Sequence, residues 1–363
     1  MASDGLWRYY GAEISYFTGK VRPAFRMKRV PHLEVLSDAE VYRTVIRPRV
    51  GFDMIPVAVT PEDETVQDSS DILDALERRY PEPVLLPPTP LQRIAAHLVE
   101  LYTDEFLLLP GIHWRWNYEE SAAKARHDFV AIMGDPGALR FADAVKAFCL
   151  VAGVVPETIP AIETHVHALL ALLEEHLAEH RWLLGAAPTL ADCAMMGPFY
   201  AHFYLDAASG TLLRTTAPRT CHWIERTNHP DPAGFGPLAA DDALPGGMRA
   251  LLGMIGRDAM PMILDCVRAV DAAIDEGSYE IGREIPRVVG MHRGTVCGVA
   301  VDRVTLPYTL WMVQRVRGAW EALGDADRAR VDRALAGTGC EALFAHVPRH
   351  RVERRPFKLH LAS

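Results

Sequence analysis

Two short polar segments of the sequence stand where a helix is expected to begin. Residues 15–19 read Ser-Tyr-Phe-Thr-Gly, and residues 20–30 behind them show helical spacing. Further along, Asp68 and Ser69 precede a second helical stretch. A helix start offers free N–H groups and positive potential, so such side chains either cap the helix or hold a charged group of a ligand. Capping is the commoner role of an isolated Asp-Ser pair, and both interpretations stay open at this point.

The elements around these segments alternate strand and helix. The strand-like stretches, in chain order, are residues 6–14, either 34–36 or 42–46, the proline-containing run 54–59, and 65–67. With the two helices, this predicts the order β, α, β, β, β, α. Prolines then crowd residues 81–90 and form a stiff linker, which indicates a domain boundary.

The remainder of the chain is mostly helical in pattern. Apolar residues recur at helical spacing from 91 to about 204, whereas residues 207–247 are rich in Pro, Gly and Asp and are expected to be irregular. A long helix is expected at 248–275. Residues 287–304 are β-branched with a central glycine, which predicts a hairpin, and 306–323 return to helix.

Composition excludes several classes of function. The 363 residues carry a net charge of −9 and contain no basic stripe, so we expect no nucleic-acid partner. No apolar run is long enough for a membrane span, and the first residues lack the pattern of a secretory signal. The six cysteines are scattered without a C-x-x-C pair. Free thiols and a cytoplasmic location therefore fit best.

One pattern typical of metal sites is present but is better explained by structure. His176 and His180 belong to a string His-x-x-Glu-His, and histidines four residues apart on a helix can bind one zinc ion. The string ends an amphipathic segment rich in Glu and His, so a solvated helix face is the preferred interpretation and we expect no metal. The sequence also lacks the nucleophile-elbow, P-loop and dinucleotide motifs.

Four separate motifs resemble the glutathione transferase superfamily. Residues 15–22 are similar to its loop between the first strand and first helix, and Ile55-Pro56-Val57 is similar to its segment with a cis proline. Residues 67–72 resemble the helix start that receives the γ-glutamyl group of glutathione. Residues 183–192 resemble the capping segment of its second domain, in which Thr189 and Asp192 are spaced as a capping box. The motifs occur in the family's order and cover about the first 205 residues.

The resemblance implies a fold and a domain division. We expect an α/β thioredoxin-like glutathione-binding domain at residues 1–82, followed by an all-α transferase-type domain at 90–240. Residues 241–363 have no counterpart in the compact two-domain members. We expect this C-terminal extension to be mostly α-helical with a β-hairpin, and to pack on the helical domain. A cover over the substrate pocket or a dimer contact is its alternative role.

The resemblance also implies which residues hold glutathione. Ser15 would donate a hydrogen bond to the glutathione thiolate, with Tyr16 and Thr18 as alternates in the same loop. The backbone edge at Ile55 and Pro56 would pair with the extended tripeptide. Asp68 would bind the amino group of the γ-glutamyl end, while Ser69 and the helix start would bind its carboxylate.

Two further expectations concern the rest of the site. Family members often carry a lysine shortly before the cis proline for the glycyl carboxylate; residues 51–54 have none, so Arg47 or Arg49 would have to substitute. The pocket for the second substrate would lie between the domains. Its candidate lining residues are Tyr102, His113, Trp114 and Trp116, although aromatic residues at helical spacing more often belong to the core.

The function implied by the resemblance is a glutathione transferase-like enzyme. It would activate the glutathione thiol, as a co-substrate, for attack on a small apolar electrophile by conjugation, elimination or isomerisation. No cysteine occurs in the first 148 residues, which disfavours the thiol-exchange subfamilies. A homodimer is expected. The alternative is a non-catalytic transferase-fold protein for binding or assembly, of the metaxin-like type.

Overall fold

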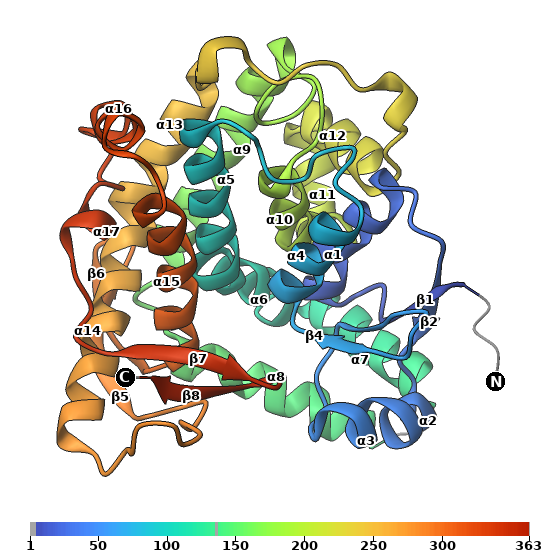
Figure 1. Ribbon diagram of the computed structural model, residues 1–363. Helices are drawn as coiled ribbons and strands as arrows, with labels where there is room; N and C mark the ends of the chain where they lie inside the picture. The colour runs from blue at the N-terminus through green and yellow to red at the C-terminus, as the bar shows by residue number, and fades with distance from the viewer. Residues whose placement is uncertain (1–4, 135–136, 363) are drawn as a thin grey trace.

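The computed structural model describes residues 5–134 and 137–362. Figure 1 shows three parts in contact: a small sheet with flanking helices at the N-terminus, a group of helices in the middle of the chain, and the C-terminal extension on the opposite side. Within the described residues, no helix has both the length and the apolar character needed to cross a membrane.

The N-terminal part is built on a four-stranded mixed sheet. Its elements are β1 Trp7–Gly11, α1 Tyr16–Met27, β2 His32–Leu36, α2 Ala39–Val41, η1 Tyr42–Ile46, α3 Arg47–Val50, β3 Val57–Val59, β4 Thr65–Gln67 and α4 Ser69–Arg79. The strand order is β2-β1-β3-β4, with β1 parallel to β2 and the other pairs antiparallel. The expected α/β fold is confirmed. Of the two candidates for the second strand, 34–36 is correct, whereas 42–46 is helical.

Helix α1 begins earlier than the sequence pattern indicated. Ser15 is its N-cap, because the Ser15 side chain accepts a hydrogen bond from the backbone N–H of Thr18 at 3.4 Å. Residues 16–19, expected as a polar break, therefore form the first turn of the helix. Phe25 packs on Trp7 and Tyr9 of β1 and, like Val21, is fully buried.

Within the described residues, the regular elements of the middle part of the chain are all helices. Its elements are α5 Pro90–Tyr102, η2 Thr103–Leu107, α6 Leu108–Trp116, α7 Glu119–Met133, α8 Ala138–Ala152, α9 Ile159–Glu179, α10 Leu190–Pro198, η3 Phe199–Tyr204, α11 Ala207–Thr216, α12 Pro218–Asn228, η4 Pro232–Gly234 and η5 Ala240–Asp242. Thr189 and Asp192 form the predicted capping box of α10. The prediction of irregular chain from 207 was wrong, because α11 and α12 occupy most of that segment up to residue 228.

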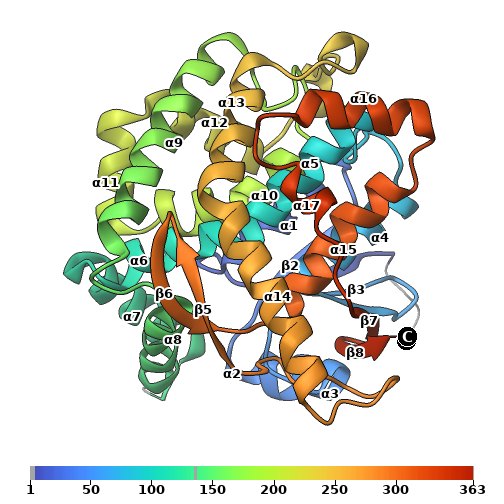
Figure 2. The ribbon, with the colours of Figure 1, turned by 90° about the vertical axis from the view of Figure 1, so that its left-hand side faces the viewer.

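The C-terminal extension contains helices and two hairpins. Its elements are α13 Gly246–Met254, η6 Ile255–Ala259, α14 Met260–Glu276, β5 Met291–Val296, β6 Val299–Val304, α15 Pro307–Glu321, α16 Asp325–Leu335, α17 Ala342–Ala345, β7 Arg351–Arg355 and β8 Lys358–Ala362. The expected hairpin is β5–β6, which lies beside α14 and α8 (Figure 2). The second hairpin, β7–β8, was not predicted.

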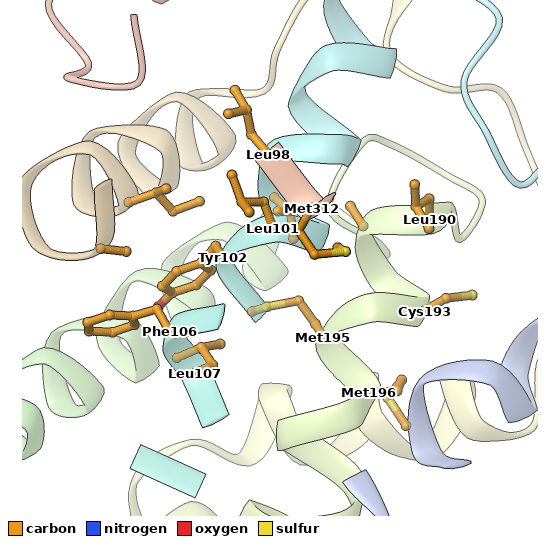
Figure 3. Packing of buried hydrophobic residues seen from close by; sticks show 14 of the residues in the cluster. Leu98, Leu101, Tyr102, Phe106, Leu107, Leu190, Cys193, Met195, Met196 and Met312 are labelled. Atoms are coloured by element: carbon orange, nitrogen blue, oxygen red, sulfur yellow. The ribbon is translucent and has the colours of Figure 1, made fainter. Parts of the chain in front are cut away.

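One continuous apolar core joins the three parts. It runs from Trp7 in β1 to Leu361 in β8. Figure 3 shows part of it, in which Leu101 of α5, Met195 of α10 and Met312 of α15 lie near one another. All six cysteines are free thiols, and five of them are buried. The extension is thus packed into the core of the molecule rather than attached at its surface.

Candidate functional site

A cavity of about 270 Å³ lies where the N-terminal sheet, the helical part and the extension meet. We call it the central cavity. It is lined from the N-terminal part by Phe17, by residues 54–56 and by residues 67–69. The helical part contributes Asp104, Glu105, Leu108, Leu109, Phe148 and Ala152. Nearly half of the lining comes from the extension, through residues 284–287, Arg303, Val304, Leu306, Tyr308, Arg354 and residues 357–359.

The proline-bearing segment before β3 forms one wall of the central cavity. Ile55 and Pro56 line it, directly before β3, and the peptide bond between them is cis, as the resemblance implies. The pairing of β3 with β1 and β4 begins at Val57, so Ile55 lies outside it and can offer its backbone groups to an extended peptide.

The start of α4 forms a second wall. Asp68 is the N-cap of this helix: one carboxylate oxygen accepts a hydrogen bond of 2.9 Å from the N–H of Ser70. Its φ angle is +91°, a conformation that costs a residue other than glycine about 1–3 kcal/mol and requires support from its surroundings. Ser69 follows it and is buried against the cavity. The helix start and Ser69 together offer donors to an anionic group.

The extension supplies the support for Asp68. The hydroxyl of Tyr308 donates to Asp68 Oδ2 at 2.8 Å, and Nη1 of Arg354 lies 3.3 Å from the same oxygen. Arg354 also donates to the backbone and side-chain oxygens of Gln67 at 3.1 and 2.8 Å, and pairs with Asp71 at 2.9 Å. Burial raises the pKa of Tyr308 well above its usual value, so this phenol stays protonated and can only donate to Asp68.

The three candidate hydroxyls of the first loop lie outside the lining of the central cavity. Ser15 caps α1, Tyr16 donates to the carbonyl of Thr103 at 2.7 Å, and Thr18 accepts from the N–H of Ala12 at 3.3 Å. None of the three is among the described residues that line the cavity, whereas their neighbour Phe17 is. The side chains of Tyr16 and Thr18 are buried, and their hydroxyl groups form hydrogen bonds within the protein interior. Ser15 alone remains partly exposed.

The aromatic residues expected to line the second-substrate pocket are instead buried in the helical core. Tyr102 bonds to His165 at 2.6 Å, His113 bonds to Glu163 at 3.0 Å, and Trp114 and Trp116 stack within the core on Tyr118 and Phe129. None of the four belongs to the described lining of the central cavity. The apolar lining comes from Leu108 and Leu109 of the same helical run, and from Phe148, Leu306 and Leu359.

Two buried acids face the cavity next to those leucines. Asp104 pairs with the fully buried Lys20 at 2.6 Å, and Glu105 accepts a hydrogen bond of 2.5 Å from the hydroxyl of Thr309. Burial raises the pKa of Glu105 to about 7. Both lie in η2, a π-helical segment between α5 and α6. Sequence reasoning missed them, although acidic residues inside an apolar helix are a recognised signal of a functional or paired site.

Four cations line the cavity, and all come from the extension: Arg287, Arg303, Arg354 and Lys358. Lys358 pairs with Glu284 at 2.8 Å, and the exposed Arg287 lies over the ring of Phe52, 4.5 Å from its centroid. Arg47 and Arg49, the candidates from the sequence for binding the glycyl carboxylate, lie elsewhere. Arg47 pairs with Asp53, Arg49 pairs with Asp63, and neither is in the described lining.

The His-x-x-Glu-His string has no metal-site geometry. The buried His176 ring contacts the carbonyl of Trp182 at 3.2 Å, and the ring of His180 lies 4.9 Å from that of His176. Among the residues that the structure describes, no group of three or more His, Cys, Asp or Glu side chains is arranged to hold a metal ion.

The fold and the cavity define a class of protein. It has a thioredoxin-like domain, whose cis-proline segment and start of α4 face a cavity, followed by a helical domain. Family models agree with this class. Residues 10–84 match the N-terminal domain of glutathione S-transferases, and residues 156–226 match their C-terminal domain. The chain belongs to the glutathione transferase superfamily.

Solved structures of the superfamily resemble the chain at low identity. A glutathione S-transferase from Rhodospirillum rubrum F11 is 19% identical with a TM-score of 0.42, over 67% of this chain and 98% of that one. The β-etherase LigF from Sphingobium sp. strain SYK-6 is 18% identical with a TM-score of 0.46, over 62% and 96%. A transferase from Methylobacterium radiotolerans JCM 2831, in complex with glutathione sulfonate, is 22% identical with a TM-score of 0.39, over 66% and 99%. No curated protein sequence matches the chain.

Proposed function

We propose that the chain is a glutathione transferase-like enzyme that binds glutathione in the central cavity and directs its thiol at a small electrophile. The observation that carries this proposal is the convergence of Ile55, Pro56, Asp68 and Ser69 on one cavity that also has an apolar side. The segment before β3 suits the peptide backbone, the start of α4 suits the γ-glutamyl carboxylate, and the leucines suit an apolar second substrate.

Thiol activation is assigned to Ser15. Its oxygen accepts a hydrogen bond from the N–H of Thr18. The hydroxyl group therefore remains free to donate a hydrogen bond to a thiolate in front of the N-terminus of α1. The N-terminus of α1 adds positive potential at the same place. The thiolate then attacks a carbon of the electrophile: the carbon–sulfur bond forms, and the leaving group departs with its electron pair.

A second candidate function is a non-catalytic binding or assembly protein on the transferase fold. Two observations favour it. The three loop hydroxyls lie outside the described cavity lining, and the chain's own Arg354 and Tyr308 already bind the Asp68 carboxylate that would receive the γ-glutamyl amino group. A protein that needs only a rigid surface has no use for a reactive thiol in this cavity.

Calorimetric titration with glutathione, paired with a chromogenic conjugation assay, separates these functions. Ser15→Ala is expected to bind glutathione but to lose turnover by about 10- to 100-fold, since a hydrogen bond to a charged group is removed. Ser15→Asp preserves the helix cap without a hydroxyl donor and should lose turnover equally, whereas Ser15→Thr should retain it. Glutathione binding without turnover in the wild type would favour the assembly protein, and absence of binding would eliminate the enzyme.

A further inference from the structure

Arg303 differs from the other cations that line the central cavity. Arg354 pairs with two carboxylates, Lys358 pairs with one, and the charge of Arg287 is exposed to solvent. Arg303 is only 5% exposed, yet no described carboxylate lies within ion-pair distance of its guanidinium. Charged side chains are rarely buried without a partner, because the loss of hydration is not recovered.

The contacts of Arg303 use only part of its hydrogen-bonding capacity. Nε donates to the carbonyl of Ala152, the last residue of α8, at 3.2 Å. A cation at a helix C-terminus is favourable, so this contact explains why an arginine is tolerated here. The two Nη groups, with four N–H donors in a plane, have no acceptor among the described residues.

The two carboxylates whose charges act on Arg303, Glu105 and Asp265, are occupied elsewhere. Glu105 accepts its hydrogen bond from Thr309, and Asp265 accepts from the backbone and hydroxyl of Thr295 and pairs with Arg268 at 2.5 Å. Both act on the pKa of Arg303 only as more distant charges, while burial lowers it. The guanidinium therefore projects unneutralised charge into a part of the cavity whose other walls include Leu108, Phe148 and Leu306.

We propose that Arg303 binds an anionic group of the second substrate, so that the electrophile is a small organic acid with an apolar body rather than a purely apolar molecule. A planar guanidinium with two free Nη groups suits a carboxylate, which it can bind through two parallel hydrogen bonds. The apolar walls beside it receive the body of the same molecule. Assigning this anion to the electrophile rests on the proposed function, whereas the anion site itself does not.

The first test compares two glutathione conjugates that differ by one carboxylate. Calorimetry on the wild-type protein is expected to show S-(4-carboxybenzyl)glutathione binding about 10-fold or more tightly than S-benzylglutathione. Arg303→Gln, which keeps a donor for Ala152, should abolish that preference. Arg293→Gln is the matched control, since Arg293 is an exposed arginine of the same hairpin and pairs with Asp302. A wild-type preference that is absent, or that survives in Arg303→Gln, would overturn the proposal.

The second test needs no glutathione and separates the two proposals. Benzoate is compared with benzamide, its uncharged analogue of the same shape, by ligand-observed NMR. Benzoate should bind the wild type and Arg293→Gln, and not Arg303→Gln; Arg303→Lys should bind it more weakly because it lacks the planar fork. If benzoate binding follows this pattern while neither conjugate binds, the anion site stands and the glutathione function falls. If the conjugates bind but benzoate binds equally well to the wild type and to Arg303→Gln, the glutathione function stands and the anion site falls.

Discussion

The hydroxyl of Tyr308 donates a hydrogen bond of 2.8 Å to the Oδ2 atom of Asp68, across a separation of 240 residues in the sequence. Asp68 caps the helix that faces the candidate glutathione site, and Tyr308 opens the helix α15 of the extension. The bond therefore joins the start of α4 in the N-terminal part to the C-terminal extension. The extension is a structural component of the candidate site.

The Tyr308→Phe variant tests the strength of this connection. We expect the free energy of unfolding to fall by about 1–2 kcal/mol, because a hydrogen bond to a buried carboxylate is lost. Urea denaturation measures it, with Tyr10→Phe as the control, since the described residues give the Tyr10 hydroxyl no hydrogen-bond partner. In a double-mutant cycle with Arg354→Met, the two effects should be non-additive because both groups bind Asp68 Oδ2. Additive effects would contradict a shared role.

Lys20→Met should be among the most destabilising substitutions in the chain. The Lys20 ammonium is fully buried and pairs with Glu100 at 2.9 Å and Asp104 at 2.6 Å, at the junction of α1 with the helical part. Removing it leaves the buried Asp104 without an ion-pair partner among the described residues, while Glu100 keeps only Arg315 at 3.6 Å and His97 at 3.5 Å. The expected cost is about 3–5 kcal/mol in urea denaturation at pH 7.

Two variants calibrate the Lys20 result. Lys124→Met removes an i,i+4 pair with Asp128 on the surface and should cost about 0.5 kcal/mol or less. The triple variant Lys20→Met, Glu100→Gln, Asp104→Asn removes both carboxylate charges as well and should recover much of the lost stability. A triple variant as unstable as the single one would show that Lys20 acts through packing alone.

Glu105 should make stability depend on pH in a predictable direction. Burial raises its folded-state pKa to about 7, above the value of an exposed glutamate. Between about pH 4.5 and 7 the folded state thus holds a proton that the unfolded state has released, so stability falls as the pH rises through this range. Glu105→Gln lacks this titration. The free energy of unfolding of the variant, relative to that of the wild type, should therefore rise by about 3 kcal/mol between pH 4.5 and pH 8. Urea denaturation across this range measures it.

The control for this experiment is Glu175→Gln, which makes the same charge change on the exposed face of α9. A difference between wild type and Glu105→Gln that stays constant across the pH range would show that the Glu105 carboxyl titrates normally.

Asp192 should contribute far more to stability than the cap that it completes. Its carboxylate accepts hydrogen bonds of 3.0 Å from the N–H groups of Leu183 and Thr189 and from the indole of Trp223. Asp192→Ala leaves three buried donors unsatisfied, and we expect a loss of about 3–5 kcal/mol. Thr189→Ala removes the N-cap hydroxyl alone and should cost about 1 kcal/mol. Thermal or urea denaturation of both variants tests this. Equal losses in the free energy of unfolding would show that Asp192 contributes no more than a helix cap.

Much of the N-terminal fold and part of the site could be predicted because their signals are local. The order of strands and helices, the helix start at Asp68 and Ser69, and the capping box of Thr189 and Asp192 each depend on residues a few positions apart. Ile55 and Pro56 were recognised in the same way. Local pattern also predicted the hairpin β5–β6, where β-branched residues flank a glycine turn. It missed β7–β8, whose many arginines obscure the alternation of Val352, Leu359 and Leu361.

The tertiary structure alone decided which side chains face the central cavity. Spacing placed Tyr102, His113, Trp114 and Trp116 on a helical run, but the face that this run turns to the cavity carries Glu105 and Leu108, and its rotation is set by packing against α9, α10 and α15. The roles of Arg303, Tyr308 and Arg354 at the cavity could not be predicted from the sequence either, because these residues bond to residues some 150 to 290 positions away. A sequence pattern specifies which residues share a face of one element. Which faces meet is determined only when the whole apolar core is buried.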